Sequence, residues 1–134
     1  MSDFVAYHSH DVMGYDYTPG DWAFYSNKPL TFLQSAIGGR VWVITGRRDD
    51  GRHMVYRLAG AYTPSEIHSE MDRHIVFGER GIPITPPVEI GAHSWFARLL
   101  DEQNNFSYGF SRIRDESIVT ELQRVLDEHQ THAA

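Results

Sequence analysis

Hydrophobic and β-branched residues alternate most clearly between residues 37 and 62, and this pattern predicts a β-hairpin. The first strand covers residues 40–45 (RVWVIT) and the second covers residues 54–62 (MVYRLAGAY), with the polar loop 46–51 between them. Both alternating sets of side chains are mostly apolar, which is typical of strands buried on both faces, as in a small barrel packed by helices. We therefore expect the Trp42 side chain to lie in the core.

Shorter patterns predict the strands around this hairpin. Residues 4–7 are prone to β structure and predict the first strand, and residues 75–77 predict a later one. Residues 81–87 contain too many prolines for a central strand of a sheet. These elements predict an α+β fold once the helices are added.

Helices are predicted where capping residues precede apolar periodicity. Ser or Thr before an acid at residues 63–66 predicts a short helix, and Pro29 can open another over residues 30–37. Ser94 is expected to cap a helix over residues 94–102, and Asp115 to cap the closing helix. The closing helix has an apolar stripe at Ile118, Leu122, Val125 and Leu126.

Composition limits the classes of protein that this sequence fits. With 134 residues, 41% hydrophobic and 22% charged, we expect one ordinary globular domain over residues 1–134. The absence of cysteine excludes disulfides, thiolate catalysis and Cys-based zinc sites. Asp3 stands where a signal peptide carries a base, and no window approaches the roughly 18 apolar residues of a membrane helix. We expect a cytoplasmic protein.

Charge is unevenly distributed along the chain. The net charge of −6 weighs against sequence-independent binding of duplex DNA. Arginines nevertheless gather in and around the hairpin, at Arg40, Arg47, Arg48, Arg52 and Arg57. The planar guanidinium suits phosphate, so this edge is a candidate phosphate site. The alternative is a solvated hairpin tip.

Catalytic motifs have little support. His8 and His10 follow the first predicted strand, where alternate residues point to one side, so their rings could share a metal ion. Such a site needs further ligands at matched spacings, and the other histidines show no supporting pattern. The sequence has neither a Gly-x-Ser-x-Gly elbow nor a phosphate-cradling glycine loop. We expect no catalytic residue, no metal and no cofactor, and a binding protein rather than an enzyme.

Aromatic residues offer a different chemistry. The chain has three tryptophans and seven tyrosines. A ring stacked on a nucleobase contributes about 1–3 kcal/mol and needs only a few polar groups beside it to recognise the base. Large aromatics also dominate ordinary cores. For Trp22, in a polar segment beside Asp21 and Ser26, the pocket and the core both stay open.

The hairpin resembles a known superfamily. The run GGRVWVITG, followed by a loop and YRLAGAY, is similar to the core hairpin of the PUA-like superfamily, which includes the EVE, ASCH and YTH domains. Residues 4–9 would correspond to the opening strand that lines the EVE pocket. Residues 94–96 and 105–110 also look like small bacterial proteins of this group. Gly39 stands where the family usually has aspartate.

The resemblance implies a small PUA-like pseudo-barrel of mostly antiparallel strands with flanking helices. It also implies a nucleic-acid-binding module that holds a flipped or modified base of DNA or RNA in an aromatic pocket, where stacking must offset a flipping cost of a few kcal/mol. The ligand-binding residues that we expect are Tyr7, His8, Ser9, Trp22, Ser26, Thr45 and Trp95. The expected phosphate-binding residues are Arg40, Arg47 and Arg48.

Two other functions stay open from the sequence. The first is a protein-interaction or accessory domain without catalytic activity. The second is a small metal-dependent hydrolase that uses His8 and His10.

Overall fold

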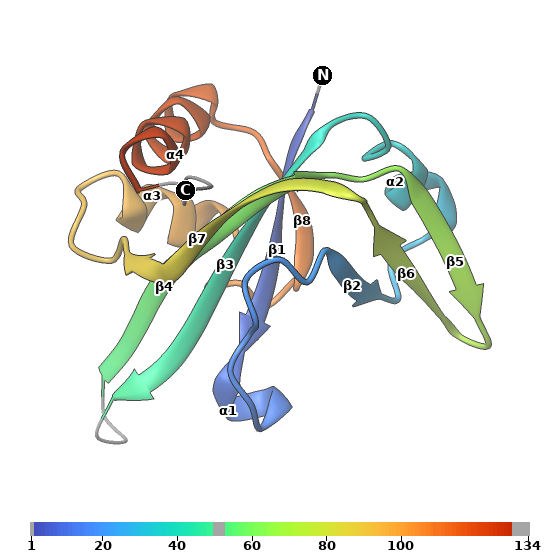
Figure 1. Ribbon diagram of the computed structural model, residues 1–134, viewed down its shortest axis with the longest axis horizontal. Helices are drawn as coiled ribbons and strands as arrows, with labels where there is room; N and C mark the ends of the chain where they lie inside the picture. Colours follow the sequence, from blue (N-terminus) through green and yellow to red (C-terminus); the bar gives the residue numbers. More distant parts are fainter. Residues whose placement is uncertain (1, 50–52, 130–134) are drawn as a thin grey trace.

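The computed structural model describes residues 2–49 and 53–129, and their elements form two β-sheets and several helices (Figure 1). The larger sheet has the strand order β7-β4-β3-β1-β8, made of β1 (Asp3–Ser9), β3 (Arg40–Asp49), β4 (His53–Thr63), β7 (Arg80–Glu89) and β8 (Phe110–Ile113). The smaller sheet has the order β2-β6-β5, made of β2 (Ala23–Ser26), β5 (Glu66–Glu70) and β6 (Arg73–Phe77). The helices are α1 (His10–Met13), α2 (Leu30–Gln34), α3 (Phe96–Glu102) and α4 (Glu116–His129).

The predicted α+β class is confirmed, with mostly antiparallel strands. Only β1 and β3 pair in parallel; the other pairs among the described strands are antiparallel. The strands form two open sheets and do not close into a barrel within the described ranges. Among those same residues, no helix has the length and apolar run needed to cross a membrane.

The predicted hairpin is confirmed as β3 and β4, but its strands are longer than predicted: residues 46–49, expected in the loop, extend β3 and pair with β4 as far as Asp49 and His53. Its loop residues 50–52, including Arg52, lie outside the described residues. Trp42 is completely buried, as expected, and its indole Nε1 donates a hydrogen bond to Oδ2 of Asp3 at 2.7 Å. This bond satisfies the one polar atom of a ring that otherwise lies in the apolar core.

Both faces of the large sheet are covered, as the hairpin pattern predicted. On one face, Val5, Trp42 and Ile44 pack with residues of α3 and α4. On the other face, alternate residues of the same strands pack against α2 and the small sheet: Phe4, Ala6, Val41 and Val43. Figure 1 shows α3 and α4 on one side of the large sheet, and α2 with the small sheet on the other.

Two of the predicted helix starts are wrong. The residues at 63–66 do not begin a helix, because Ser65 donates its N–H to Phe77 O and the following residues pair with β6 as strand β5. Ser94 does not cap α3. This helix begins at Phe96 and has no side-chain cap, because buried Trp95 occupies the N-cap position. The proline-rich segment lies in β7, an edge strand of the large sheet, which fits the expectation that it is not central.

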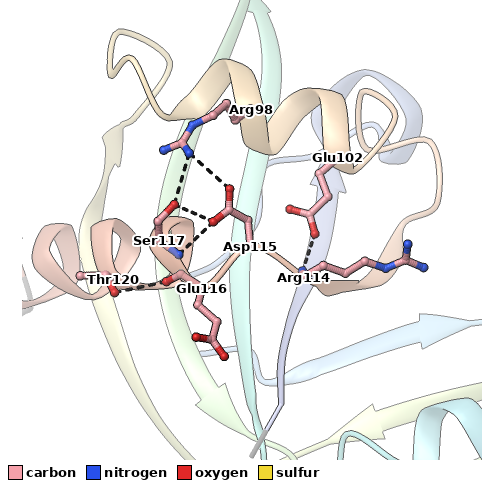
Figure 2. A network of polar contacts seen from close by, with 7 residues as sticks. All are labelled: Arg98, Glu102, Arg114, Asp115, Glu116, Ser117 and Thr120. Atoms are coloured by element: carbon pink, nitrogen blue, oxygen red, sulfur yellow. Dashed lines mark hydrogen bonds and ion pairs between the residues drawn. The ribbon is translucent and has the colours of Figure 1, made fainter.

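The closing helix matches its prediction and is fixed by a polar network (Figure 2). Its apolar stripe is buried in the core. Asp115 Oδ1 accepts hydrogen bonds from the Ser117 amide at 2.9 Å and from the Ser117 hydroxyl at 2.6 Å. Arg98 of α3 contacts Asp115 Oδ2 at 3.3 Å, and Glu102 accepts from the Arg114 amide. The network therefore joins the start of α4 to α3.

Gly81 leaves room for the Trp22 ring, so adding a methyl group there should destabilise the protein. A Cβ at Gly81 would lie 2.3 Å from Cε2 of Trp22, whose ring already stacks on Tyr62 at 5.5 Å. We expect Gly81→Ala to lower the free energy of unfolding by about 1–3 kcal/mol, as overpacking does. Urea denaturation measures this, with Gly91→Ala as control because a Cβ at Gly91 meets nothing within 4 Å. Equal stability of the two variants would contradict the packing.

Asp115 should make the stability sensitive to acid. Hydrogen bonds from Ser117 hold the pKa of Asp115 below its ordinary value of 3.8. The Asp115 carboxylate therefore binds a proton more tightly in the unfolded chain than in the folded one. Its contribution to folding stability is present above about pH 4 and is lost as the pH falls through the pKa of the folded state. We expect Asp115→Ala to lower the thermal midpoint by a few degrees at pH 7, and the difference to shrink towards pH 3. Asp101→Ala, on exposed α3 surface, should not show this pattern.

Candidate aromatic cavity beside β1

A cavity of about 620 Å³ lies at the carboxyl end of β1, beside α1. Its wall comes from the end of β1, from α1, from the connection to β2, from β2 itself and from the segment before β8. The lining residues are Tyr7, His8, Ser9, Val12, Met13, Tyr15, Tyr17, Thr18, Asp21, Ala23, Phe24, Tyr25, Phe106, Ser107 and Gly109.

The cavity is where β1 loses one of its two neighbouring strands. Strand β8 pairs with β1 only from Asp3 to Ala6, whereas β3 pairs with it as far as Ser9. The chain before β8 turns away through left-handed backbone at residues 104–106 and at Gly109. The turn leaves one hydrogen bond to β1, in which Tyr7 donates to Gly109 O at 2.9 Å.

Stacked aromatic rings form much of the cavity wall. Tyr7 stacks on Phe106 with ring centroids 4.8 Å apart and 10° between the ring planes. Tyr17 stacks on Phe24 at 5.5 Å and 24°. The His8 ring lies 5.2 Å from Tyr15 and 5.8 Å from Tyr17. These rings pack against one another, so the wall is held in place by its own aromatic contacts.

A few polar groups accompany the rings. His8 Nε2 lies 2.7 Å from Tyr15 O. A carbonyl oxygen only accepts, so Nε2 carries the hydrogen, and in the neutral ring Nδ1 is an acceptor. The Tyr17 hydroxyl donates to Asp21 O, and burial raises the pKa of Tyr17. Burial, with a smaller contribution from Tyr56, raises the pKa of Tyr7 to about 12, so both phenols are neutral at pH 7.

A second, more polar cavity of about 280 Å³ adjoins the first and shares His8 and Tyr17 with it. Its other lining residues are His10, Asp16, Thr45, Gly46, Arg47, Arg57, Pro86 and Pro87. Asp16 Oδ2 lies 3.2 Å from the Arg47 guanidinium, and Asp16 Oδ1 lies 2.9 Å from His10 Nδ1, at an angle unsuited to a hydrogen bond. The first cavity thus offers rings, and the second offers guanidinium groups.

The structure brings four of the seven ligand-binding residues that the sequence predicted to the two adjoining cavities. Tyr7, His8 and Ser9 line the aromatic cavity. His8 and Thr45 line the polar one, where the phosphate candidate Arg47 also lies. The neighbouring candidate Arg48 lies 3.8 Å from Asp11 in an exposed ion pair.

The other predicted site residues lie elsewhere. Trp22 is 8% exposed and packs against Gly81 and Tyr62, so of the two possibilities left open by the sequence, the structure places it in the core. Trp95 is buried in the core on the opposite face of the large sheet, among residues of α3 and α4. Buried Ser26 accepts a hydrogen bond from the Lys28 amide at 3.1 Å.

Arg40 is also remote from the two cavities. Its guanidinium donates to Gln123 of α4 and lies 5.4 Å from the Trp42 ring centroid. Arg40 is the first residue of β3, whereas Arg47 lies near the other end of this strand.

Sequence reasoning missed the aromatic residues that complete the cavity. These are Tyr15, Tyr17, Phe24, Tyr25 and Phe106. The first four fall within eleven residues between β1 and the end of β2, a density that could have drawn attention. They share no strand or helix period, so the sequence pattern did not show that they face one space.

The described residues do not support a metal centre. They contain no group of three or more histidine, aspartate or glutamate side chains that could hold a metal ion. His8 and His10 do line the same polar cavity, but β1 ends at Ser9 and His10 begins α1. The strand alternation that motivated the pair therefore does not reach His10.

No protein family, curated protein or solved structure matches this chain. The similarity of the hairpin to the PUA-like superfamily thus stays a prediction from the sequence.

The buried tyrosines should resist ionisation and make the protein sensitive to alkali. Because the pKa of Tyr7 is about 12 in the folded chain and about 10 when unfolded, its contribution to stability is present below pH 10 and is lost as the pH rises towards 12. We expect Tyr7→Phe to show a shallower loss of stability over this interval, measured by urea denaturation at fixed pH. The exposed Tyr108→Phe serves as control, and identical slopes for the two variants would contradict the shift.

Proposed function

We propose that this chain is a nucleic-acid-binding module that holds a nucleobase, modified or unmodified, in the aromatic cavity beside β1. The observation that carries the proposal is the cavity of about 620 Å³ walled by the stacked pairs Tyr7–Phe106 and Tyr17–Phe24. Its volume lies within the range of small-ligand sites, about 300–1,000 Å³.

The lining chemistry suits a flat heterocycle. Each base stacked on an aromatic ring contributes about 1–3 kcal/mol, whatever its sequence. Single bases are then distinguished by hydrogen bonds to their edges, and His8, Ser9 and Asp21 bring polar groups to the same wall. An apolar wall with a small number of polar groups is the usual composition of a specific binding site.

The adjoining polar cavity suits the phosphate of the same nucleotide. Arg47 and Arg57 line it, and their partners are acids on the surface: Asp16 at 3.2 Å and Glu89 at 3.6 Å. Exposed ion pairs of this kind are worth only about 0–1 kcal/mol, so a phosphate can replace the carboxylate at small cost. Because the two cavities share His8 and Tyr17, a base in one places its phosphate close to the other.

The same proposal includes a PUA-like fold and DNA or RNA as the partner. It is supported by the hairpin sequence and by its position between helices on one face and the small sheet on the other. The cytoplasmic location expected from the sequence belongs to this proposal as well.

A protein-interaction role is the second candidate function, because the mouth of the aromatic cavity carries exposed apolar side chains. Val12 is 83% exposed, and Met13 and Tyr15 are about half exposed. A partner protein would cover these residues of α1 and its connection to β2, and would not need the interior of the cavity.

Titration of short single-stranded oligonucleotides tests the proposed function. Each DNA or RNA strand would carry a fluorescent label and one central base that is varied among the four bases and their methylated forms. We expect at least one base to bind in a manner that depends on Tyr15, an exposed ring of the cavity wall that lies 5.2 Å from the His8 ring. Tyr15→Ala should weaken that binding by about 5- to 160-fold, through loss of about 1–3 kcal/mol of stacking. Fluorescence anisotropy at constant salt measures the affinity.

The matched control is Ile37→Ala, which removes an exposed apolar side chain outside both cavities. This variant should bind as the unaltered protein does. The proposal fails if no base binds, or if Tyr15→Ala binds as tightly as the control.

A further inference from the structure

The end of β1 has an open backbone edge that faces the aromatic cavity. One edge of β1 pairs with β3 along its whole length, to Ser9. The other edge pairs with β8 only as far as Ala6, and the cavity begins at the next three residues, Tyr7, His8 and Ser9. The backbone of residues 7–9 therefore lies at the wall without a neighbouring strand on that side.

The direction of each peptide group on this edge follows from one hydrogen bond. Tyr7 donates its N–H to Gly109 O, so the backbone groups of Tyr7 point to the edge away from β3. In a strand, the N–H and C=O of one residue point to the same edge, and the direction alternates from residue to residue. The register with β3 is regular to Ser9, whose φ of −96° and ψ of 118° are extended. Consequently the Tyr7 C=O and the Ser9 N–H both point to the cavity side.

Neighbouring groups already have other contacts. The Gly109 amide, which would face the Tyr7 carbonyl if β8 continued, donates to Phe106 O at 3.2 Å. The Ser9 hydroxyl accepts a hydrogen bond from the Val12 amide at 3.3 Å and so caps α1. The cavity wall thus presents one backbone acceptor and one backbone donor side by side, next to the stacked Tyr7 and Phe106 rings.

We propose that this backbone pair, the Tyr7 C=O and the Ser9 N–H, selects the ligand, and that the ligand is a flat ring with a hydrogen-bond donor beside an acceptor on one edge. The amidine edge of adenine and the lactam edge of hypoxanthine have this arrangement. The inference rests on the proposed function and names the chemical group that the cavity recognises. The backbone pair would satisfy the donor and the acceptor of the ring edge at once, so recognition of the ring needs no charged side chain.

An extended peptide is a poorer occupant of the same edge. Peptides that add a strand to a sheet need a row of free backbone groups and pockets for alternate side chains. Here the free edge covers only residues 7–9, because α1 begins at His10 and Gly109 already bonds to Tyr7. The short edge suits a ring better than a strand.

Three nucleosides of similar size test the inference. Adenosine carries a donor and an acceptor on its edge, inosine carries both in reversed order, and purine riboside keeps a ring acceptor but has no donor. We expect adenosine and inosine to bind at least about tenfold more tightly than purine riboside, because the latter leaves the Tyr7 carbonyl buried without a partner. Calorimetric titration measures the affinities. In ¹⁵N-labelled protein, the Ser9 amide proton should move downfield when adenosine binds.

A pair of variants separates the backbone from the side chain of Ser9. Ser9→Pro removes the N–H at an edge position that no ladder bond occupies, where proline is tolerated in strands. Both Ser9→Pro and Ser9→Ala remove the side-chain hydroxyl, but Ser9→Ala keeps the backbone N–H. We therefore expect Ser9→Pro to lower adenosine affinity at least about tenfold further than Ser9→Ala does. Circular dichroism of the two variants establishes that both are folded, and the nucleoside series in the unaltered protein stands without them.

The outcomes distinguish this inference from the proposed function. If the three nucleosides bind alike and the Ser9 amide signal does not move, the cavity holds bases and the backbone pair does not select them. If the Ser9 amide responds to an extended peptide and to no nucleoside, the edge takes a strand and the inference is overturned. If no nucleoside and no oligonucleotide binds, the proposed function and the inference fail together.

Discussion

The parallel pairing of β1 with β3 is the constraint on which the rest of the structure depends. Two parallel neighbours cannot be joined by a tight turn, so the chain has to return along the length of the sheet before β3 begins. Residues 10–39 make that return, and they contain α1, β2 and α2. The crossover covers one face of the large sheet, supplies a strand to the small sheet and forms most of the cavity wall. A hairpin between the first two strands of the large sheet would have left no such enclosure.

The cavity lies where this crossover and the end of β8 leave a sheet edge uncovered. An exposed edge presents free peptide groups and invites pairing with other chains, so proteins usually shorten or cover it. Here β1 is central over Asp3–Ala6 and becomes an edge only over its last residues. Aromatic rings and α1 surround that short edge, which keeps other strands away while a small flat molecule can still enter. The proposed ligand site and the protection of the edge are therefore the same arrangement of side chains.

The sheet was predictable from the sequence because its strands carry period-two patterns, whereas the cavity was not. Val41, Trp42 and Val43 alternate between two buried faces, which the apolar pattern of the hairpin indicated. Tyr7, His8 and Ser9 were expected from the resemblance of residues 4–9 to a pocket-lining strand, and they do line the cavity. Tyr15 and Tyr17 lie in a connection without regular structure, so their direction depends on tertiary packing that no local pattern encodes. Trp22 was ambiguous for the same reason, and only its fit against Gly81 placed it in the core. Strand β5 was missed because Ser65 and Glu66 resemble a helix start, and pairing with β6 outweighs that local preference.

The crossover has a consequence for how this protein can evolve. None of residues 10–16, which make up α1 and the start of the connection to β2, is buried, whereas the core positions of the strands are. Substitutions there can alter the shape and polarity of the cavity wall while the strands that define the fold stay unchanged. The strands that define the fold and much of the wall of the proposed site are thus encoded by different stretches of sequence, so the shape of the wall can vary while the architecture and the backbone edge of β1 are kept.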